Sequence, residues 1–453
     1  MTWWSKVMGG GVLLGSVFIV GTNGGWAQGP ASQSIPGSAA GVLQSAQTIN
    51  GADTAWVLVS SALVLAMIIP GLALFYGGQV RSKNVLGTMM QSFAILCLVS
   101  LLWVLVGYSL AFGPDHSGVI GGLDWMALEG VGLSPHPTYG PTIPHQAFMI
   151  FQMMFAAITP ALITGAFAER MKFSALVMFS GLWSLAVYCP IVHWLWGGGW
   201  LARVGALDFA GGAVVHISSG ISALVCVMVL GARRGYGTDY MAPHNLPMVL
   251  LGTGLLWLGW FGFNAGSALG ANETAVAAFV ATQAAAVTGA VAWMTMEWTH
   301  RGAPTVLGIA SGAVAGLAMV TPGAGYISIF SAVLVGLIAG ASSYWTIIKK
   351  GKFGYDDSLD VVGIHGVAGV LGMLLTGLLA SKAVNASGAN GLMFGNAVFF
   401  GAQIVAVLGV CMFAAVSTWV ILKLVDRLVG LRVSAEEEAM GLDLSQHNEK
   451  AYS

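Results

Sequence analysis

The sequence carries very little charge. Charged residues make up 8% of its 453 positions, whereas a soluble domain carries about 25%, so an ordinary water-soluble domain is excluded. The formal net charge of -1 provides no net basic field, and we do not expect nucleic acid to be a partner. Hydrophobic residues make up 57%, which excludes a disordered chain and indicates a protein embedded in a lipid bilayer.

Cysteine is also scarce, with four residues that lie inside apolar runs and show no CxxC spacing. This pattern argues against a disulfide framework and a thiolate metal site, and we interpret the thiols as packing residues. We expect no metal and no cofactor. Glycine, in contrast, is abundant at 64 residues, and because small residues let membrane helices approach closely, we expect tight helix packing.

Long apolar runs recur along the chain, each of about 20 residues or more, the length that crosses a bilayer as a helix. A transmembrane β-barrel would need alternating apolar and polar residues, which these runs lack. The sequence therefore predicts an all-α integral membrane protein with eleven transmembrane helices, at 54–78, 86–112, 146–168, 174–196, 210–231, 246–268, 274–298, 304–320, 326–348, 360–381 and 395–422.

Lys and Arg residues gather on one side of this predicted topology. The loops after odd-numbered spans and the C-terminal tail hold fourteen of them: Arg81, Lys83, Arg170, Lys172, Arg233, Arg234, Arg301, Lys349, Lys350, Lys352, Lys423, Arg427, Arg432 and Lys450. The opposite loops hold only Arg203 and Lys382. Since basic loops stay in the cytoplasm, we expect the N-terminus outside the cell and the C-terminus inside.

The N-terminal region resembles a cleaved signal peptide at residues 1–27. Lys6 precedes an apolar stretch at 7–20, and Gly25-Trp26-Ala27 places small residues at both positions that signal peptidase inspects. The alternative is a retained first helix. A polar segment follows at 28–53, then the membrane domain at 54–422 and a tail at 423–453.

Eleven spans divide into two five-helix units and one extra helix. Because five is odd, a repeated five-helix unit must be inverted, and inverted repeats place substrate sites at their interface near the midplane. A short motif supports the repeat, because an aspartate followed by His-x-x-x-Gly occurs at the fifth span and at the tenth: Asp208, His216 and Gly220, then Asp360, His365 and Gly369.

His216 and His365 are the only ionisable residues placed well within a predicted span, since every Asp and Glu falls in a loop, a tail or a helix end. Carboxylate-based Na⁺ coordination and an Asp/Glu proton relay are therefore not expected. Three alternatives remain for the histidines. They could bond across helices as structural groups, they could ligate haem, or His216 could act as a base with Ser218 or Ser219 in an intramembrane enzyme.

Aromatic residues form a second concentration near polar breaks, at Phe155, Trp196 and Phe263 among others. Most membrane aromatics belong to the core or to the interfacial belt. If a Trp face converged with a hydroxyl such as that of Ser267, however, ring electrons and oxygen lone pairs would together form a site for a small cation that donates hydrogen bonds.

Several long blocks share one resemblance. They are DFAGGAVVHISSG at 208–220, GWFGFNAGSA at 259–268, DDSLDVVGIHGVAGVLG at 356–372, and the tail GLRVSAEEEAMGLDLSQHNEKAYS. From about Asp53 to the C-terminus the chain resembles a bacterial member of the ammonium transporter family (Amt/Mep/Rh). The resemblance implies a homotrimer with one pore per subunit in the bacterial inner membrane, with residues 28–53 in the periplasm, and a transporter rather than an enzyme.

The resemblance also implies roles for individual residues. Phe155, Trp196 and Ser267 would recruit ammonium at the outer end of the pore, and Phe155 and Phe263 would form a gate beneath. His216 and His365 would be the twin histidines of an apolar conduit, and Asp208 would support the site by bonding backbone groups at a helix N-terminus.

The expected mechanism is that NH₄⁺ loses a proton near the gate, NH₃ crosses the apolar stretch, and the two histidines carry the proton. Electrogenic and neutral transport both remain open. A sensor that binds ammonium but conducts little is an alternative function. The tail is either a solvated appendage or an ordered regulatory segment, and the resemblance favours the second, with a PII signalling protein as partner at the cytoplasmic face.

Overall fold

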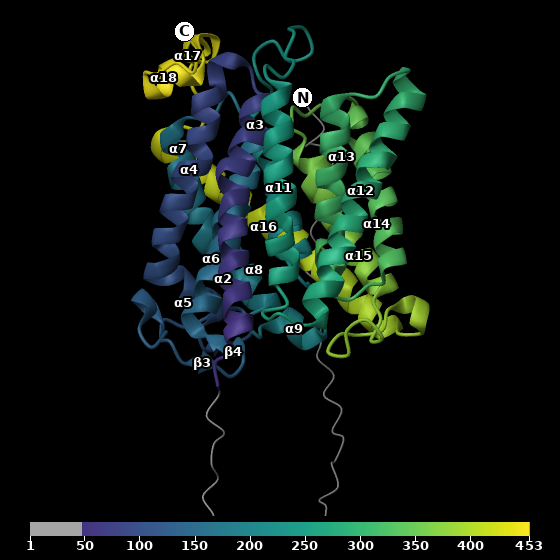
Figure 1. Cartoon of the computed structure of the whole chain (residues 1–453). Helices are drawn as coiled ribbons and strands as arrows, with labels where there is room; N and C mark the ends of the chain where they lie inside the picture. Colours follow the sequence, from purple (N-terminus) through teal and green to yellow (C-terminus); the bar gives the residue numbers. More distant parts are fainter. Residues whose placement is uncertain (1–47, 453) are drawn as a thin grey trace, which may run out of the picture. The chain divides into compact units, whose positions relative to one another are not determined.

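Eleven apolar helices long enough to cross a membrane run through the part of the chain that the computed structural model describes, residues 48–452. They span Gly51–Gln79, Ser82–Phe112, His145–Ala166, Phe173–Val204, Gly212–Leu230, Leu246–Gly266, Glu273–Arg301, Val306–Gly323, Ile329–Phe353, Val362–Leu379 and Ala397–Val429. The predicted all-α architecture with eleven spans is confirmed (Figure 1). The predicted signal peptide at 1–27, and residues 28–47 after it, lie outside the described residues.

Many spans change helix type along their length. In chain order the helical pieces are α2 Gly51–Ala66, η1 Met67–Leu72, α3 Ala73–Gln79, η2 Ser82–Asn84, α4 Val85–Leu102, η3 Trp103–Gly107, α5 Tyr108–Phe112, η4 Met126–Leu128, α6 His145–Ile163, η5 Thr164–Ala166, α7 Phe173–Trp183, η6 Ser184–Tyr188, α8 Cys189–Leu195, α9 Trp200–Val204, η7 Gly212–Ile217, α10 Ser218–Leu230, α11 Leu246–Gly266, α12 Glu273–Arg301, α13 Val306–Val320, η8 Thr321–Gly323, α14 Ile329–Lys349, η9 Lys350–Phe353, η10 Val362–Val367, α15 Ala368–Leu379, η11 Leu392–Phe394, α16 Ala397–Val429, α17 Ala435–Met440 and α18 Leu442–His447. The two predicted histidines both lie in π-helical segments, His216 in η7 and His365 in η10. Such turns are frequent at functional sites.

Several helices begin at side chains that accept hydrogen bonds from the first turn. Asn50 precedes α2, Asn245 precedes α11, and Ser434 forms a reciprocal capping box with Glu437 at α17. These side chains satisfy backbone N–H groups that have no partner within the helix.

The last span extends further than predicted. The sequence placed its end at residue 422, before the first charged side chain, whereas α16 continues to Val429. Lys423, Asp426 and Arg427 are exposed on this extension. Charge ends an apolar run but not a helix, because Lys and Arg are good helix formers.

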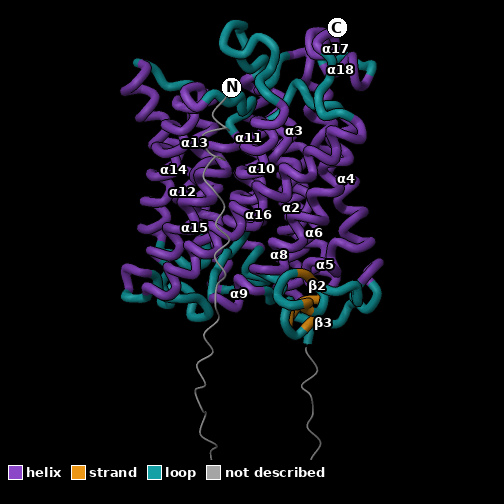
Figure 2. The backbone as a smooth tube through the Cα atoms, turned by 180° about the vertical axis from the view of Figure 1, so that it is seen from behind, coloured by secondary structure: helices purple, strands orange, loops and turns teal. Residues whose placement is uncertain are grey.

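The two ends of the helix bundle differ. Two small antiparallel hairpins lie at one end, β1 Asp115–His116 with β2 Ile120–Gly121 and β3 Pro135–His136 with β4 Gly140–Pro144. The C-terminal helices α17 and α18 lie at the other end, and Figures 1 and 2 show this from opposite sides. We call these ends the hairpin face and the tail face.

The fifth and tenth spans run in opposite directions and cross closely. In the fifth span η7 precedes α10, which lies toward the tail face, whereas in the tenth span η10 precedes α15, which lies toward the hairpin face (Figure 2). At the crossing a Cβ on Gly220 would overlap the backbone of Gly366, and a Cβ on Gly369 would lie 2.8 Å from the Gly212 carbonyl oxygen. Glycine at these positions lets the two backbones touch.

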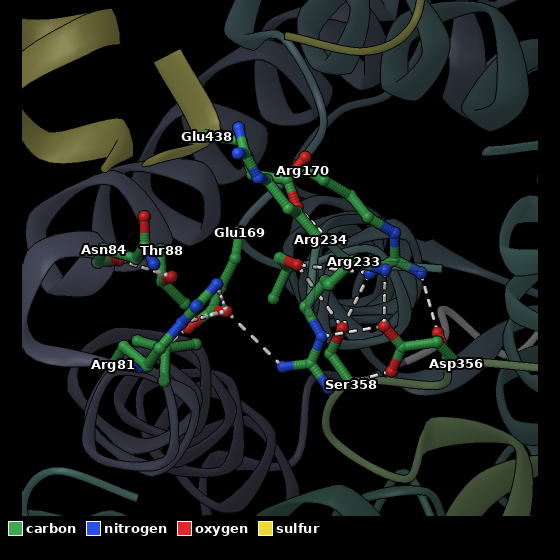
Figure 3. Close-up of polar contacts among 12 residues, drawn as sticks. Arg81, Asn84, Thr88, Glu169, Arg170, Arg233, Arg234, Asp356, Ser358 and Glu438 are labelled. Carbon is green, nitrogen blue, oxygen red and sulfur yellow. Dashed lines mark hydrogen bonds and ion pairs between the residues drawn. The ribbon is translucent and has the colours of Figure 1, made fainter. Parts of the chain in front are cut away.

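Buried ion pairs join the loops of the tail face (Figure 3). Arg81 pairs with Glu169 at 2.7 Å and Arg233 with Asp356 at 2.8 Å, and the Glu169 and Asp356 side chains are fully buried. Burial raises the pKa of Glu169, but the Arg81 and Arg233 guanidinium groups more than offset this, so its pKa lies below the ordinary value. Arg170 also donates to the Asp356 carbonyl oxygen at 2.7 Å.

The C-terminal tail is packed onto this face and is not a solvated appendage. Arg432 pairs with Glu438 at 2.8 Å, and Glu438 also accepts from the Arg234 N–H at 2.7 Å. The Asp443 carboxylate accepts from the Gly87 N–H at 2.8 Å. These contacts come from separate loops and helices, so the tail is held along most of its length.

Candidate functional site

A cavity of about 300 Å³ opens between the helices at the hairpin face. Trp196 and Ser267, predicted from the sequence as recruitment residues, both line it, and so does Asp208. Other lining residues are Phe112, Tyr139, Phe148, Gln152, Phe209 and Tyr326. The cavity is therefore lined mainly by aromatic rings, with a few oxygen atoms among them.

Hydrogen bonds orient the two recruitment side chains. The Trp196 indole N–H donates to the Asp208 carbonyl oxygen at 2.8 Å, and the Ser267 hydroxyl donates to the Phe263 carbonyl oxygen at 2.8 Å. Each side chain has thus used its proton within the protein. What remains is the face of the indole and the lone pairs of the hydroxyl, which suit a cation that donates hydrogen bonds.

Two buried phenylalanines lie next to the cavity. The Phe155 ring packs edge-on against Trp196, with centroids 5.8 Å apart, and lies tilted by 33° against Phe263, with centroids 4.3 Å apart. Both rings are at most 1% exposed. The structure therefore brings together the two residues predicted as the gate, next to the predicted recruitment residue Trp196.

The two predicted histidines are in direct contact. The Nδ1 atoms of His216 and His365 lie 3.2 Å apart, and their rings are nearly parallel at 18°. One nitrogen must donate and the other accept, so the pair is asymmetric at any moment. Phe263 lies 6.1 Å from His216 between ring centroids, and this places the histidines next in line after the phenylalanines.

Trp260 forms the wall beside His216. Its ring stacks on the imidazole with centroids 5.6 Å apart, and its indole N–H donates to the Thr321 hydroxyl at 3.0 Å. Thr321 donates to Asn264, which donates to Thr282. This bonded chain across three helices fixes the plane of the wall, while the Nε2 atom of His216 is buried without a partner in the described part of the chain.

Asp208 caps the helix that carries His216. Its carboxylate accepts four backbone N–H bonds of 2.6–3.0 Å, from Gly211, Gly212, Ala213 and Val214. Burial raises the pKa of this carboxyl group, and the four donors oppose that shift. Because every lone-pair direction is occupied by backbone, Asp208 positions the helix and has no free oxygen for a ligand.

The counterpart of Asp208 in the second repeat is Asp357, not Asp360 as the sequence motif indicated. Asp357 accepts from the N–H of Val362 at 2.8 Å, at the start of η10, whereas Asp360 pairs with Lys350. The sequence spacing between aspartate and histidine could have identified Asp357. Asp208 and Asp357 each lie eight positions before their histidine.

The geometry disfavours two of the alternatives for the histidines. A haem held by both histidines would need its porphyrin ring between the two imidazoles. The two rings instead stack on each other at 18° with centroids 5.2 Å apart and Nδ1 atoms at 3.2 Å, which leaves no room for the porphyrin. Ser218 and Ser219 donate to the carbonyl oxygens of Val214 and Val215, each at 2.5 Å. Neither hydroxyl bonds the imidazole of His216, as an activated nucleophile would.

Two residues of the site were not singled out from the sequence. Trp260 was not separated from other membrane aromatics, and Gln152 lay unnoticed within the FQMMF segment. A polar side chain three positions before Phe155, on the same side of the helix, was the available signal for Gln152.

Comparison with known proteins identifies the family of the chain. The model of the Ammonium Transporter Family matches residues 55–452. The chain belongs to this family. Among its relatives, an ammonium transporter of Bacillus subtilis is 52% identical over 392 residues, which cover 86% of this chain and 96% of the relative. The family comprises transporters rather than enzymes.

Solved structures of related proteins have the same fold. Saccharomyces cerevisiae Mep2 superposes with a TM-score of 0.81 at 34% identity, covering 86% of this chain and 89% of that one. A structure described as a sensor Amt protein superposes with a TM-score of 0.80 at 28% identity, covering 87% of this chain and 98% of that one. Family and fold together support ammonium transport by a multi-pass membrane protein.

Proposed function

We propose that the protein conducts ammonium across the bacterial inner membrane by separating the cation into NH₃ and a proton. NH₄⁺ binds in the hairpin-face cavity against Trp196 and Ser267, above Phe155. NH₃ then passes along His216 and His365. The observation that carries the proposal is the line of contacting rings from the cavity to the 3.2 Å histidine pair.

The recruitment step follows from what the cavity offers. The indole face of Trp196 attracts a positive charge, with a gain of about 2 kcal/mol when desolvated, and the Ser267 oxygen accepts one N–H bond. Na⁺ can also bind an oxygen lone pair, but it holds its hydration shell strongly, and a few neutral oxygens among aromatic rings replace little of the water that it would have to shed. The site therefore favours ammonium over sodium.

Deprotonation follows from the gate. Phe155 and Phe263 pack together with no polar atom between them, and a charge in such surroundings is costly. The histidine pair can take the proton, because its shared Nδ1 contact accommodates one proton on either ring and lets it move between them. If the proton crosses together with NH₃, transport is electrogenic.

The experiment is uptake of labelled methylammonium by cells that lack their own ammonium transporters, with Trp196→Leu as the recruitment variant. We expect uptake by the native protein and a reduced rate at low substrate for the variant. A native protein that binds substrate but gives no uptake would instead be a sensor.

Recordings from proteoliposomes test the proton path. An ammonium step should produce a current in the native protein, and the double variant His216→Ala/His365→Ala should lose it. A native protein without current would refute the relay, and an unchanged current in the double variant would refute the role of the pair.

We further propose that the hairpin face lies in the periplasm and the tail face in the cytoplasm. The distribution of Lys and Arg supports this orientation. A fluorescent protein fused after Tyr452 should then fold and fluoresce, because the C-terminus stays in the cytoplasm. A fusion that is exported and cleaved by external protease would reverse the orientation.

A homotrimer with a PII signalling protein at its cytoplasmic face completes the proposal, and the family resemblance supports it. Native mass spectrometry of the detergent-solubilised protein should give three copies. The packed tail offers a defined surface for the partner, and pull-down of PII under different nucleotide conditions tests the contact. A monomeric mass, or no PII capture under any nucleotide condition, would remove the corresponding part.

A further inference from the structure

Gln152 is an amide without a structural task at the wall of the recruitment cavity. It lies on α6 and lines the cavity together with Trp196 and Ser267. The residue is only 8% exposed, and its side-chain oxygen is buried with no hydrogen-bond partner in the described part of the chain. An unpaired buried carbonyl is costly, and at the wall of a cavity a bound ligand can supply the missing donor.

Other glutamines show what a structural role requires. Gln403 donates from its amide to the Leu207 carbonyl oxygen at 2.8 Å and accepts from the Leu207 N–H at 2.9 Å, so that it ties the loop after the fourth span to α16. Gln79 donates to the Phe75 carbonyl oxygen at 3.1 Å. Gln152 makes neither kind of bond within residues 48–452, and its amide turns about its last torsion with two comparable orientations.

The position suits a ligand of the recruited cation. Gln152 precedes Phe155 by one helical turn, and α6 begins at the hairpin face, so the amide lies toward the mouth of the cavity relative to the gate. Ammonium has four N–H donors. Ser267 satisfies one, and the side-chain carboxylate of Asp208 is fully occupied by backbone N–H groups.

We propose that the Gln152 amide oxygen is a second oxygen ligand of the recruited ammonium ion and sets the affinity of the recruitment site. The inference rests on the proposed recruitment function of this cavity. With Ser267 directly after α11 and Gln152 on α6, two N–H groups are fixed by neutral oxygens, and the positive charge faces the rings. Neutral ligands hold the ion without trapping it, since a carboxylate at this point would bind a cation of any kind.

The test compares two near-isosteric variants. Gln152→Met keeps the length and removes the acceptor, and Gln152→Glu keeps an oxygen acceptor and adds charge. We expect Gln152→Met to raise the half-saturating ammonium concentration about tenfold, the loss of one hydrogen bond to a charged group, with the maximal rate unchanged. Gln152→Glu should leave that concentration at or below the native value.

The readout is inhibition of methylammonium uptake by ammonium, together with the maximal uptake rate. Gln91→Met is the matched control, because Gln91 on α4 is also buried with an unpaired amide oxygen but does not line the cavity. It should not shift the half-saturating concentration.

The opposite signs expected for Met and Glu separate ligation from packing. Gln152 is not a ligand if both Gln152 variants raise the half-saturating concentration equally. It is also not a ligand if neither variant changes that concentration while Trp196→Leu raises it. In both cases the proposed recruitment site itself is retained. If Trp196→Leu and Ser267→Ala also leave it unchanged, the proposed recruitment site fails and this inference fails with it.

Discussion

The crossing of the two histidine-bearing helices provides a sharp test, because its two glycines are not equivalent. A Cβ on Gly220 would overlap the Cα and N atoms of Gly366, whereas a Cβ on Gly366 would lie 3.4 Å from Gly220, an ordinary contact. Carbon atoms need about 3.5 Å, so Gly220→Ala must push the helices apart by about 1 Å. The Nδ1 separation of 3.2 Å would then grow to about 4 Å, beyond hydrogen-bonding distance.

We expect Gly220→Ala to lower methylammonium uptake at least tenfold, since the proton can no longer pass directly between the rings, and to destabilise the fold by about 1–3 kcal/mol through overpacking. Gly366→Ala should keep most of the uptake. The assay is uptake corrected for the amount of protein in the membrane, with gel filtration in detergent to show that both variants fold. Equal uptake by the two variants, whether high or low, would refute the reasoning from the crossing.

Three further predictions concern the supports of the site and the tail face. Asp208→Asn leaves one side-chain oxygen for four N–H donors. The free energy of unfolding should fall by about 3 kcal/mol, so the melting temperature in detergent should decrease by several degrees. An unchanged melting curve would contradict this prediction. The pKa of Glu169 lies below its ordinary value of 4.5, so its ion pairs stabilise the fold fully above pH 4.5, and this stabilisation is lost as the pH falls through the folded-state pKa. The melting temperature should therefore decrease when the pH is lowered beneath about 4.5, and Glu169→Gln should make the melting temperature less dependent on acid pH. Glu438→Gln loses the ion pair with Arg432 and should make the tail more sensitive to limited proteolysis, whereas the exposed Glu436→Gln should not; equal cleavage of both would show that the pair does not hold the tail.

Much of the fold could be predicted because it depends on local composition. Eleven apolar runs gave eleven helices, and His216 and His365 stood out since they were the only ionisable groups deep in a predicted span. The contact between them could not be predicted, because it joins residues 149 positions apart and depends on how closely two helices cross.

The errors have similar physical causes. Choosing Asp360 over Asp357 followed from proximity in sequence to the histidine, whereas the cap is decided by which carboxylate reaches the first N–H groups of η10. Gln152 escaped notice because an amide is a routine residue until its neighbours are known. Its unpaired oxygen is visible only once the cavity is formed.

The line from Trp196 through Phe155 and Phe263 to His216 and His365 is built entirely from one polypeptide. If ammonium follows the proposed route, assembly is not needed to bring these residues together, and each copy in an oligomer should conduct independently of its neighbours. When native and inactive copies are made together, flux should decline in simple proportion to the inactive share. A steeper decline would mean that the copies in an oligomer are functionally coupled. The tail could carry such coupling, because it is bound to several loops of its own chain.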